Sequence, residues 1–306
     1  GAVSAFGMKG APGERFQLQE VTLEGKQGQP KIVQIPVTGM ITSGSLGGET
    51  SSAELLEAQL DRARKDDNVK AILLTLNSGG AGVTGSDIMH QKVMEYKKAT
   101  GEPVVASMRD IAASGAYYVA AGCDRIIAHP TTVTGSIGVI VPLYDATELM
   151  KRVGVKSDPV TSGKFKDMGS PFVEQPEGER EKERELFQEL VDSMYERFVK
   201  VVSEGRGLDV EKVKEIADGR VFTSQKAVDL GLVDSIGYYE DAVSRVKESA
   251  GIEDAHIVTY KRILTLSDMF GRLVSGHEVN LNVAGNRPML SAGQPMYLWT
   301  PPAENQ

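Results

Sequence analysis

Apolar residues in the first half of the chain follow the pattern of an α/β protein with a mostly parallel sheet. The segments 31–41, 70–77, 103–108 and 124–130 are short and rich in β-branched or other apolar residues, as expected for strands. The run KAILLTLN at 70–77 is almost wholly apolar. Such a run is typical of a strand that is buried on both faces of a parallel sheet.

Helical patterns separate these strands. Ser51 and Glu54 have the spacing of a capping box, which predicts a helix that runs to about residue 65. Apolar residues at helical spacing predict a second helix near 85–98, and the segment 112–122 predicts a short apolar one. Strands that alternate with helices in this way indicate βαβ units.

The second half of the chain is more helical. After a densely charged segment at 177–185, an apolar stripe runs from Leu186 to Val202 and predicts an amphipathic helix of about six turns. Gly205 and Gly207 mark its end. Shorter elements follow: a helix at 209–217, a strand at 219–222 and a helix at 223–231.

Both ends of the chain have compositions that differ from the rest. We expect residues 1–29 to be a flexible N-terminal segment, residues 30–276 to form one folded domain, and residues 277–306 to be an extended tail. The chain opens with small residues and no Met, so we expect that an upstream anchor or signal has been removed. No apolar run approaches the ~20 residues that span a bilayer.

Composition excludes some classes of protein. Of 306 residues, 41% are hydrophobic and 25% are charged, which is the balance of a packed globular protein. The net charge of −8 argues against a surface that binds nucleic acid. Cys123 is the single cysteine and cannot form an intramolecular disulfide, so we expect it to be a small buried residue.

Ser114 is a candidate nucleophile because it lies between a predicted strand and a predicted helix. A helix start offers free N–H groups and the positive end of the helix dipole, and Gly115 lets a backbone amide approach a substrate closely. A serine at this position is also the usual N-cap. The glycine-rich turn NSGGAGV at 77–83 follows another buried strand and could expose amides as an oxyanion hole, or simply connect two elements.

The base that would activate a serine is less evident. The four histidines are His90, His129, His256 and His277, and none has a compelling acidic partner in the sequence. A lysine can serve if burial favours its neutral amine. SGKFKDMGSP at 162–171 offers Lys164 and Lys166, although most lysines are solvated surface groups.

Taken together, these segments resemble the signal peptide peptidase A family of Ser–Lys serine peptidases. IPVTGMI at 35–41, NSGGAGV at 77–83 and MRDIAASGAYYVA at 108–120 resemble its first strand, its glycine turn and its nucleophile segment. TGSIGV at 134–139, SGKFKDMGSP at 162–171 and DGRVFTSQKAVDLGLVDSIG at 218–237 resemble its later motifs in the same order. The resemblance covers roughly residues 30–245.

The resemblance implies a role for each matching residue. Ser114 would be the nucleophile, Lys166 rather than Lys164 the general base, and Ser136 the hydroxyl that orients the lysine amine. The amides of Ala81 and Gly115 would form the oxyanion hole. Ala81 replaces the second glycine of the family's pair, and it would be strained if that position requires a positive φ.

The implied fold is α/β, a crotonase/Clp-like spiral of ββα units with additional C-terminal helices. The implied setting is the cell membrane, with a single N-terminal anchor, an extracytoplasmic catalytic domain and remnant signal peptides as substrates. The implied assembly is a ring-like or dome-shaped homo-oligomer. Because one copy of the fold carries both Ser114 and Lys166, we expect Lys166 to reach Ser114 of a neighbouring subunit. We expect no cofactor, no metal and no nucleic acid.

Two other functions remain open at this point. A crotonase-type acyl-CoA enzyme would share the fold and the oxyanion hole but would not need Ser114 with Lys166. A membrane scaffold that lacks activity is conceivable because of Gly79 and Ala81 in the oxyanion turn. We also expect that the tail, with Trp299, docks in or near the cleft as a pseudo-substrate or packs on the domain surface.

Overall fold

The structure is a computed structural model of the chain, and it describes residues 17–44, 50–263 and 296–298. The larger sheet contains β1 (Leu18–Glu24), β2 (Lys31–Thr38), β3 (Val69–Ser78), β5 (Val104–Ala113), β6 (Arg125–Ala128), β7 (Val133–Gly135), β8 (Val221–Thr223), β9 (Ser235–Ile236) and β10 (His256–Arg262). A second, two-stranded sheet contains β4 (Gly80–Gly82) and β11 (Met296–Leu298).

The helices are α1 (Ser52–Arg64), α2 (Val83–Thr100), α3 (Gly115–Ala120), α4 (Thr147–Val153), α5 (Glu177–Arg206), α6 (Val210–Ile216), α7 (Ser224–Asp229) and α8 (Tyr239–Ala250). None of the helices in the described part of the chain is both long and apolar enough to cross a membrane.

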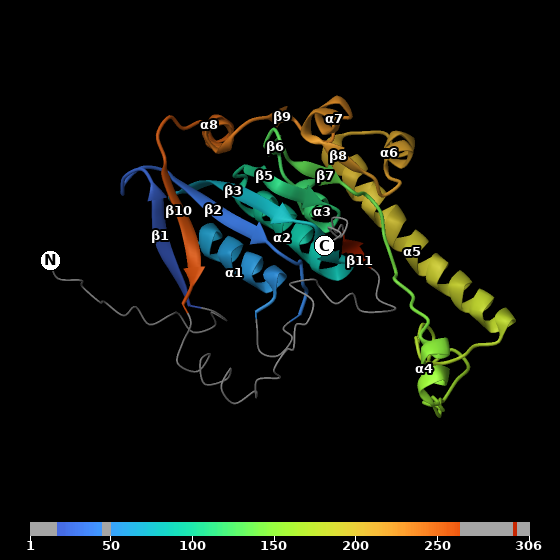
Figure 1. Cartoon of the computed structure of the whole chain (residues 1–306). Helices are drawn as coiled ribbons and strands as arrows, with labels where there is room; N and C mark the ends of the chain where they lie inside the picture. The colour runs from blue at the N-terminus through green and yellow to red at the C-terminus, as the bar shows by residue number, and fades with distance from the viewer. Residues whose placement is uncertain (1–16, 45–49, 264–295, 299–306) are drawn as a thin grey trace.

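The main sheet has the order β1-β10-β2-β3-β5-β6-β9, and β7 and β8 continue from the end of β5. The strands from β10 to β9 pair in parallel, whereas β1 pairs with β10 in the antiparallel sense. Helices α1, α2 and α3 cover one face and α8 covers the other (Figure 1). The large core lies on the first of these faces, and a smaller core lies under α8.

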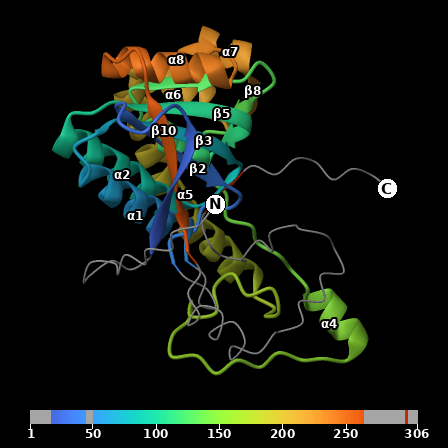
Figure 2. The same cartoon turned by 90° about the vertical axis from the view of Figure 1, so that its left-hand side faces the viewer.

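A projecting arm, defined here as residues 143–176, connects the strand ends to α5. It contains α4 and the loop that follows it. Figures 1 and 2 both show the arm beyond the far end of α5, away from the sheet. Several of its apolar side chains are exposed: Leu149, Val153, Val155, Val160 and Phe172.

The predicted α/β fold class with additional C-terminal helices is confirmed, and so is the capping box of Ser51 and Glu54 at the start of α1. Three boundaries differ from the prediction. Residues 18–24 are paired as β1 instead of belonging to a flexible segment, and the strand β5 extends to Ala113, so the helix after it is shorter. The charged segment 177–185 is the start of α5.

Candidate active site

Three strand ends bring the candidate residues to one edge of the sheet. In the parallel pairs β3–β5 and β5–β7, Ser78 lies opposite Ala112 and Ala113 lies opposite Gly135. Ser114 and Ser136 each follow directly after one of the paired residues Ala113 and Gly135. The two serines are therefore neighbours, and the turn after Ser78 lies at the same edge.

Ser114 has an unusual backbone for a non-glycine residue, with φ 53° and ψ −117°. Its N–H donates to the Gly135 carbonyl at 2.7 Å, and its carbonyl accepts from the Tyr118 N–H at 2.9 Å. The residue is 1% exposed, and its hydroxyl does not cap α3. Ser114 therefore stands at the N-cap position of α3 without a capping hydrogen bond from its side chain. A strained conformation of this kind costs about 1–3 kcal/mol and persists only where the surroundings hold it in place.

Ser136 shares this feature. Within the described residues, Ser114 and Ser136 are the two non-glycine residues with positive φ, and Ser136 has φ 50°. The Ser136 N–H donates to the Arg220 carbonyl at 2.8 Å, which fixes the segment between β7 and β8. Such residues cluster at functional sites.

Two adjacent tyrosines hold α3 in place. The Tyr117 hydroxyl donates to the Leu232 carbonyl at 2.8 Å, and the Tyr118 hydroxyl donates to Asp87 of α2 at 2.6 Å. Both side chains are fully buried. These two hydrogen bonds fix the position of α3. The N–H of Gly115, the first in the helix, has no acceptor within α3, because the first N–H groups of a helix never have one.

The turn before α2 is shaped by Ser78. Its hydroxyl donates to the Gly39 carbonyl at 2.5 Å and accepts from the Gly80 N–H at 3.0 Å. The positive φ of 91° falls on Gly80, and Ala81 is not among the described residues with positive φ. The strain that would follow from a positive φ at Ala81 is therefore absent.

One edge of β4 at Ala81 faces away from Ile41. The Gly80 carbonyl and the Gly82 N–H both bond to Ile41, so the N–H and carbonyl of Ala81 face the opposite side of the strand. On that side lies β11, antiparallel to β4, with Tyr297 opposite Ala81. The other edge of β11 pairs with Ile140 through Met296, at 2.9 Å and 3.0 Å. A short extended peptide segment is thus held between the turn that contains Ala81 and the segment after Ser136.

Within the tail the structure describes residues 296–298, which pair beside the turn that contains Ala81. Trp299 and the rest of the tail lie outside the described residues. Next to Ile140 a groove of about 520 Å³ opens between the segment 136–140 and α5, and Ser136, Gln188, Asp192 and Tyr195 line it.

The two lysines lie in the arm. Lys164 pairs with Glu179 at 3.1 Å and lies 5.5 Å from the Phe165 ring. Lys166 is exposed, and no ion pair of its amine occurs within the described residues. No hydrogen bond or ion pair joins the arm to Ser114, Gly115 or Ala81 in the described part of the chain. The structure therefore brings Ser114, Ser136, Gly115 and Ala81 together. It leaves the lysine loop, residues 162–171, apart from them.

The described histidines have other partners. His90 packs edge-on against Tyr118, and burial lowers its pKa. His129 bonds to Thr131 at 2.8 Å, and His256 bonds to Thr22 at 2.8 Å. His277 lies outside the described residues.

The sequence interpretation missed residues that shape the site without touching a substrate. Ser78 was part of a recognised motif, and its position directly after a buried strand could have indicated a role in the turn. Tyr117 and Tyr118 were counted only as an apolar helix, and nothing local in the sequence shows that their hydroxyls bond to Leu232 and Asp87.

Comparison with known proteins identifies the class. Residues 96–253, more than half of the chain, match the model of peptidase family S49. The chain belongs to this family and is a serine protease.

Several relatives carry informative names. A protein from Enterococcus faecium named as a signal peptide peptidase, SppA, is 38% identical over 253 residues, which are 81% of this chain and 72% of that protein. Protease 4 from Salmonella typhi is 33% identical over 231 residues, 76% of this chain and 36% of its own length. The chloroplastic serine protease SPPA from Arabidopsis thaliana is 31% identical over 253 residues, 81% of this chain and 37% of its own length. The chain thus spans just over a third of these last two relatives.

Two solved structures are similar at low identity. A mutant of the membrane-bound stomatin-specific protease 1510-N has a TM-score of 0.47 and 15% identity, over 72% of this chain and 86% of that one. A ClpP1 mutant from Listeria monocytogenes has a TM-score of 0.45 and 19% identity, over 69% of this chain and 94% of that one.

Proposed function

We propose that this serine protease is an endopeptidase that uses Ser114 as nucleophile and Lys166 as general base. The observation that carries the proposal is Ser114 itself, which is buried and held at positive φ, and whose side chain makes no capping hydrogen bond to α3. Non-glycine residues in such strained conformations concentrate at active sites, where the surrounding structure holds them in place. Ser136, the second described residue of this kind, lies directly beside it.

The reaction follows from these positions. The Ser114 hydroxyl attacks the scissile carbonyl while the lysine amine takes its proton, and the N–H groups of Gly115 and Ala81 stabilise the oxyanion that forms. The lysine ammonium then gives its proton to the departing peptide amine, which leaves an acyl-enzyme on Ser114. Water, activated by the same amine, hydrolyses the ester. The hydroxyl of Ser136 orients the amine.

The substrate is an extended peptide. A segment of backbone, β11, already lies antiparallel to the oxyanion turn and pairs on both edges, which is the geometry an extended substrate would adopt there. Cleavage of remnant signal peptides is supported by the names of the relatives and requires a groove that accepts apolar side chains. We further propose that the protein acts at the cell membrane through an N-terminal anchor, with its catalytic domain on the extracytoplasmic side.

Assembly completes the site. The arm, which contains Lys166, extends away from α3 of its own chain (Figure 1). The amine would therefore meet Ser114 in a neighbouring subunit of a ring or dome. The exposed apolar residues of the arm, such as Leu149 and Val160, support a role in subunit contact. Burial of the lysine in that contact would favour its neutral form, because a low dielectric disfavours the ammonium.

Complementation between inactive variants tests this function. Ser114→Ala and Lys166→Ala should each lose peptide hydrolysis, and a mixture of the two should partly recover it under conditions of subunit exchange. Recovery occurs because some junctions contain both wild-type residues. If exchange is proven by mass spectrometry and the mixture stays inactive, the shared site is refuted. A crotonase-type enzyme or a silent scaffold would show no hydrolysis in the wild type.

A further inference from the structure

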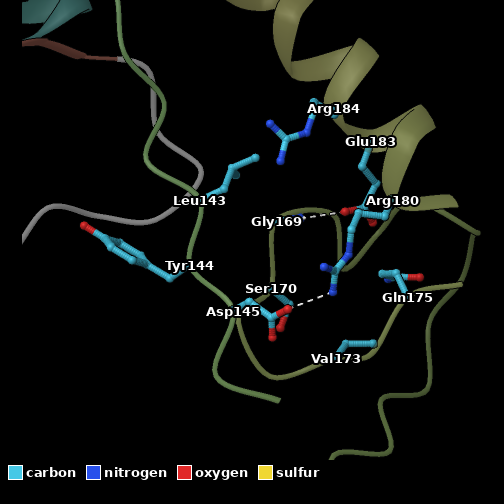
Figure 3. A pocket seen from close by; sticks show the side chains of 10 residues that line it. All are labelled: Leu143, Tyr144, Asp145, Gly169, Ser170, Val173, Gln175, Arg180, Glu183 and Arg184. Carbon is cyan, nitrogen blue, oxygen red and sulfur yellow. Dashed lines mark hydrogen bonds and ion pairs between the residues drawn. The ribbon is translucent and has the colours of Figure 1, made fainter. Parts of the chain in front are cut away.

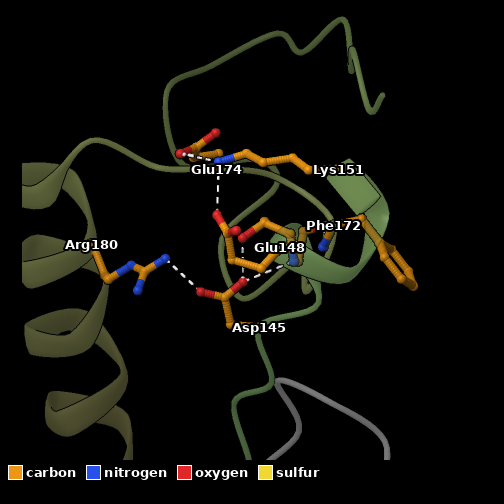
Figure 4. Close-up of polar contacts among 8 residues, drawn as sticks. Asp145, Glu148, Lys151, Phe172, Glu174 and Arg180 are labelled. Atoms are coloured by element: carbon orange, nitrogen blue, oxygen red, sulfur yellow. Dashed lines mark hydrogen bonds and ion pairs between the residues drawn. The ribbon is translucent and has the colours of Figure 1, made fainter. Parts of the chain in front are cut away.

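A set of polar contacts fastens both sides of the arm to the first turns of α5. Asp145 Oδ2 pairs with Arg180 Nη2 at 2.8 Å, as Figure 4 shows. On the other side of the arm, the Gly169 N–H donates to Glu183 Oε2 at 3.5 Å (Figure 3). These four residues come from the segment that enters α4, from the end of the lysine loop and from α5.

Asp145 joins two elements through one carboxylate. Its Oδ1 accepts from the Thr147 N–H at 3.0 Å and the Thr147 hydroxyl at 2.6 Å, while its Oδ2 pairs with Arg180. Hydrogen bonds from Thr147 and then Arg180 lower the pKa of Asp145 to about 2, so the carboxylate is charged at any ordinary assay pH. The Ala146 N–H donates to the Pro171 carbonyl at 2.8 Å, which joins the entering and leaving segments of the arm.

Near its end, the lysine loop packs so closely against α5 that no side chain fits at Gly169. Gly169 has φ 78°, and a Cβ there would lie 2.9 Å from Cζ of Phe187, a buried residue of α5. Glu183 is 9% exposed and bonds to the same glycine. The backbone three residues after Lys166 is thus locked against α5, and the remaining loop is a series of turns in which the Lys166 N–H donates to the Gly163 carbonyl at 3.1 Å.

We propose that Arg180 and Glu183 are positioning residues for Lys166: they fix the direction in which the arm leaves α5 and so determine where the amine arrives in the neighbouring subunit. The inference rests on the proposed function, in which Lys166 serves a serine of another chain. Proton transfer needs close, oriented groups, and a displacement of about 1 Å can cost a factor on the order of 100 in rate. An exposed ion pair such as Arg180–Asp145 adds little to the stability of the fold, so positioning is the effect that its loss should reveal.

Mixed assemblies separate positioning from a merely structural role. In a mixture of Ser114→Ala and Lys166→Ala, the active junctions use Lys166 from the first chain and Ser114 from the second. Arg180→Ala is added either to the Ser114→Ala chain, whose arm serves the active junctions, or to the Lys166→Ala chain, whose arm does not. We expect kcat of the first mixture to fall by roughly 10- to 100-fold, with KM little changed. The second mixture should keep the kcat of the parent mixture.

Controls keep the two proposals distinguishable. Arg245→Ala removes an ion pair of the same length, 2.8 Å to Glu248 on α8, and should change neither mixture. Glu183→Ala, which removes the acceptor of the Gly169 N–H, should give the same asymmetry if Arg180→Ala fails to assemble. An equal loss from Arg180→Ala on either chain, or no loss on either, overturns the inference while the parent mixture still supports the shared site. An inactive parent mixture with proven exchange refutes the shared site and the inference with it.

Discussion

Two glycines of α5 offer a sharp test of how this helix supports the nucleophile. Gly205 lies near its C-terminal end, where a Cβ would lie 2.0 Å from the Ala121 carbonyl oxygen and 2.9 Å from the Ala121 carbonyl carbon. Ala121 is the C-cap of α3, the helix that Ser114 begins. Gly178 lies in the first turn of α5, where a Cβ would meet nothing within 4 Å. Helix propensity alone predicts that Gly→Ala stabilises both sites, since alanine is favoured by about 1 kcal/mol.

The structure predicts that the two substitutions change the free energy of unfolding in opposite directions. At Gly205 the new Cβ falls about 1.4 Å short of an ordinary contact at 3.4 Å, and the obstacle is backbone that cannot rotate away. Overpacking of this kind costs about 1–3 kcal/mol, and for a clash this severe we take the upper end of that range, so Gly205→Ala should lose about 2 kcal/mol after the gain in propensity. Gly178→Ala should gain roughly 0.5–1 kcal/mol.

Urea unfolding at one fixed protein concentration measures both changes, because assembly otherwise alters the apparent stability. The midpoint should fall for Gly205→Ala and rise for Gly178→Ala. Peptide hydrolysis should also fall for Gly205→Ala, since α3 has to shift to admit the methyl group. If Gly205→Ala is as stable as the wild type or more stable, the close approach of α5 and α3 is not a constraint and the reasoning is wrong.

Three further predictions concern single groups. Lys166→Ala should lower kcat/KM by roughly 100- to 10,000-fold, whereas Lys164→Ala, which only breaks the pair with Glu179, should keep most activity; equal losses would contradict the assignment. Burial raises the pKa of Cys123 to about 12, so a thiol reagent at pH 8 should modify it only after unfolding, and rapid labelling of the native protein would be contrary evidence. Deletion of residues 285–306 should raise kcat/KM for an extended peptide because β11 no longer occupies the edge of Ala81; unchanged kinetics would remove the pseudo-substrate role.

The elements that could be predicted from the sequence are those with local signals. The apolar run of β3 and the capping box of α1 depend on residues close together in the chain, and both are confirmed. Strand β1 was missed because its partner, β10, lies more than 200 residues away and no local pattern shows that pairing. The charged segment 177–185 was predicted to lie outside the helix because it lacks an apolar stripe. In the structure it is the start of α5, and its side chains form ion pairs such as Lys182–Glu185 and Arg180–Asp145.

The features of the site also divide into those with a local signal in the sequence and those that depend on distant contacts. Motif order alone indicated Ser114, Ser136, Gly115 and Ala81, and the structure places all four at one edge of the sheet. Which glycine of the turn needs a positive φ could not be read from the sequence, because that depends on the bonds from Ser78 and Ile41. The place of Lys166 also depends on contacts of the arm with α5 that no motif encodes.

The most direct measurement of the central claim is covalent labelling with a fluorophosphonate probe followed by peptide mapping. The account predicts one modified residue, Ser114, with no labelling of the Ser114→Ala variant. Labelling of Ser136→Gly should be slower but still map to Ser114, because this variant loses the hydroxyl that orients the amine while glycine suits the positive φ of Ser136. The account also predicts slow labelling of Lys166→Ala, because the hydroxyl then lacks its base. Labelling that persists in Ser114→Ala, or that maps to another serine, would contradict the account.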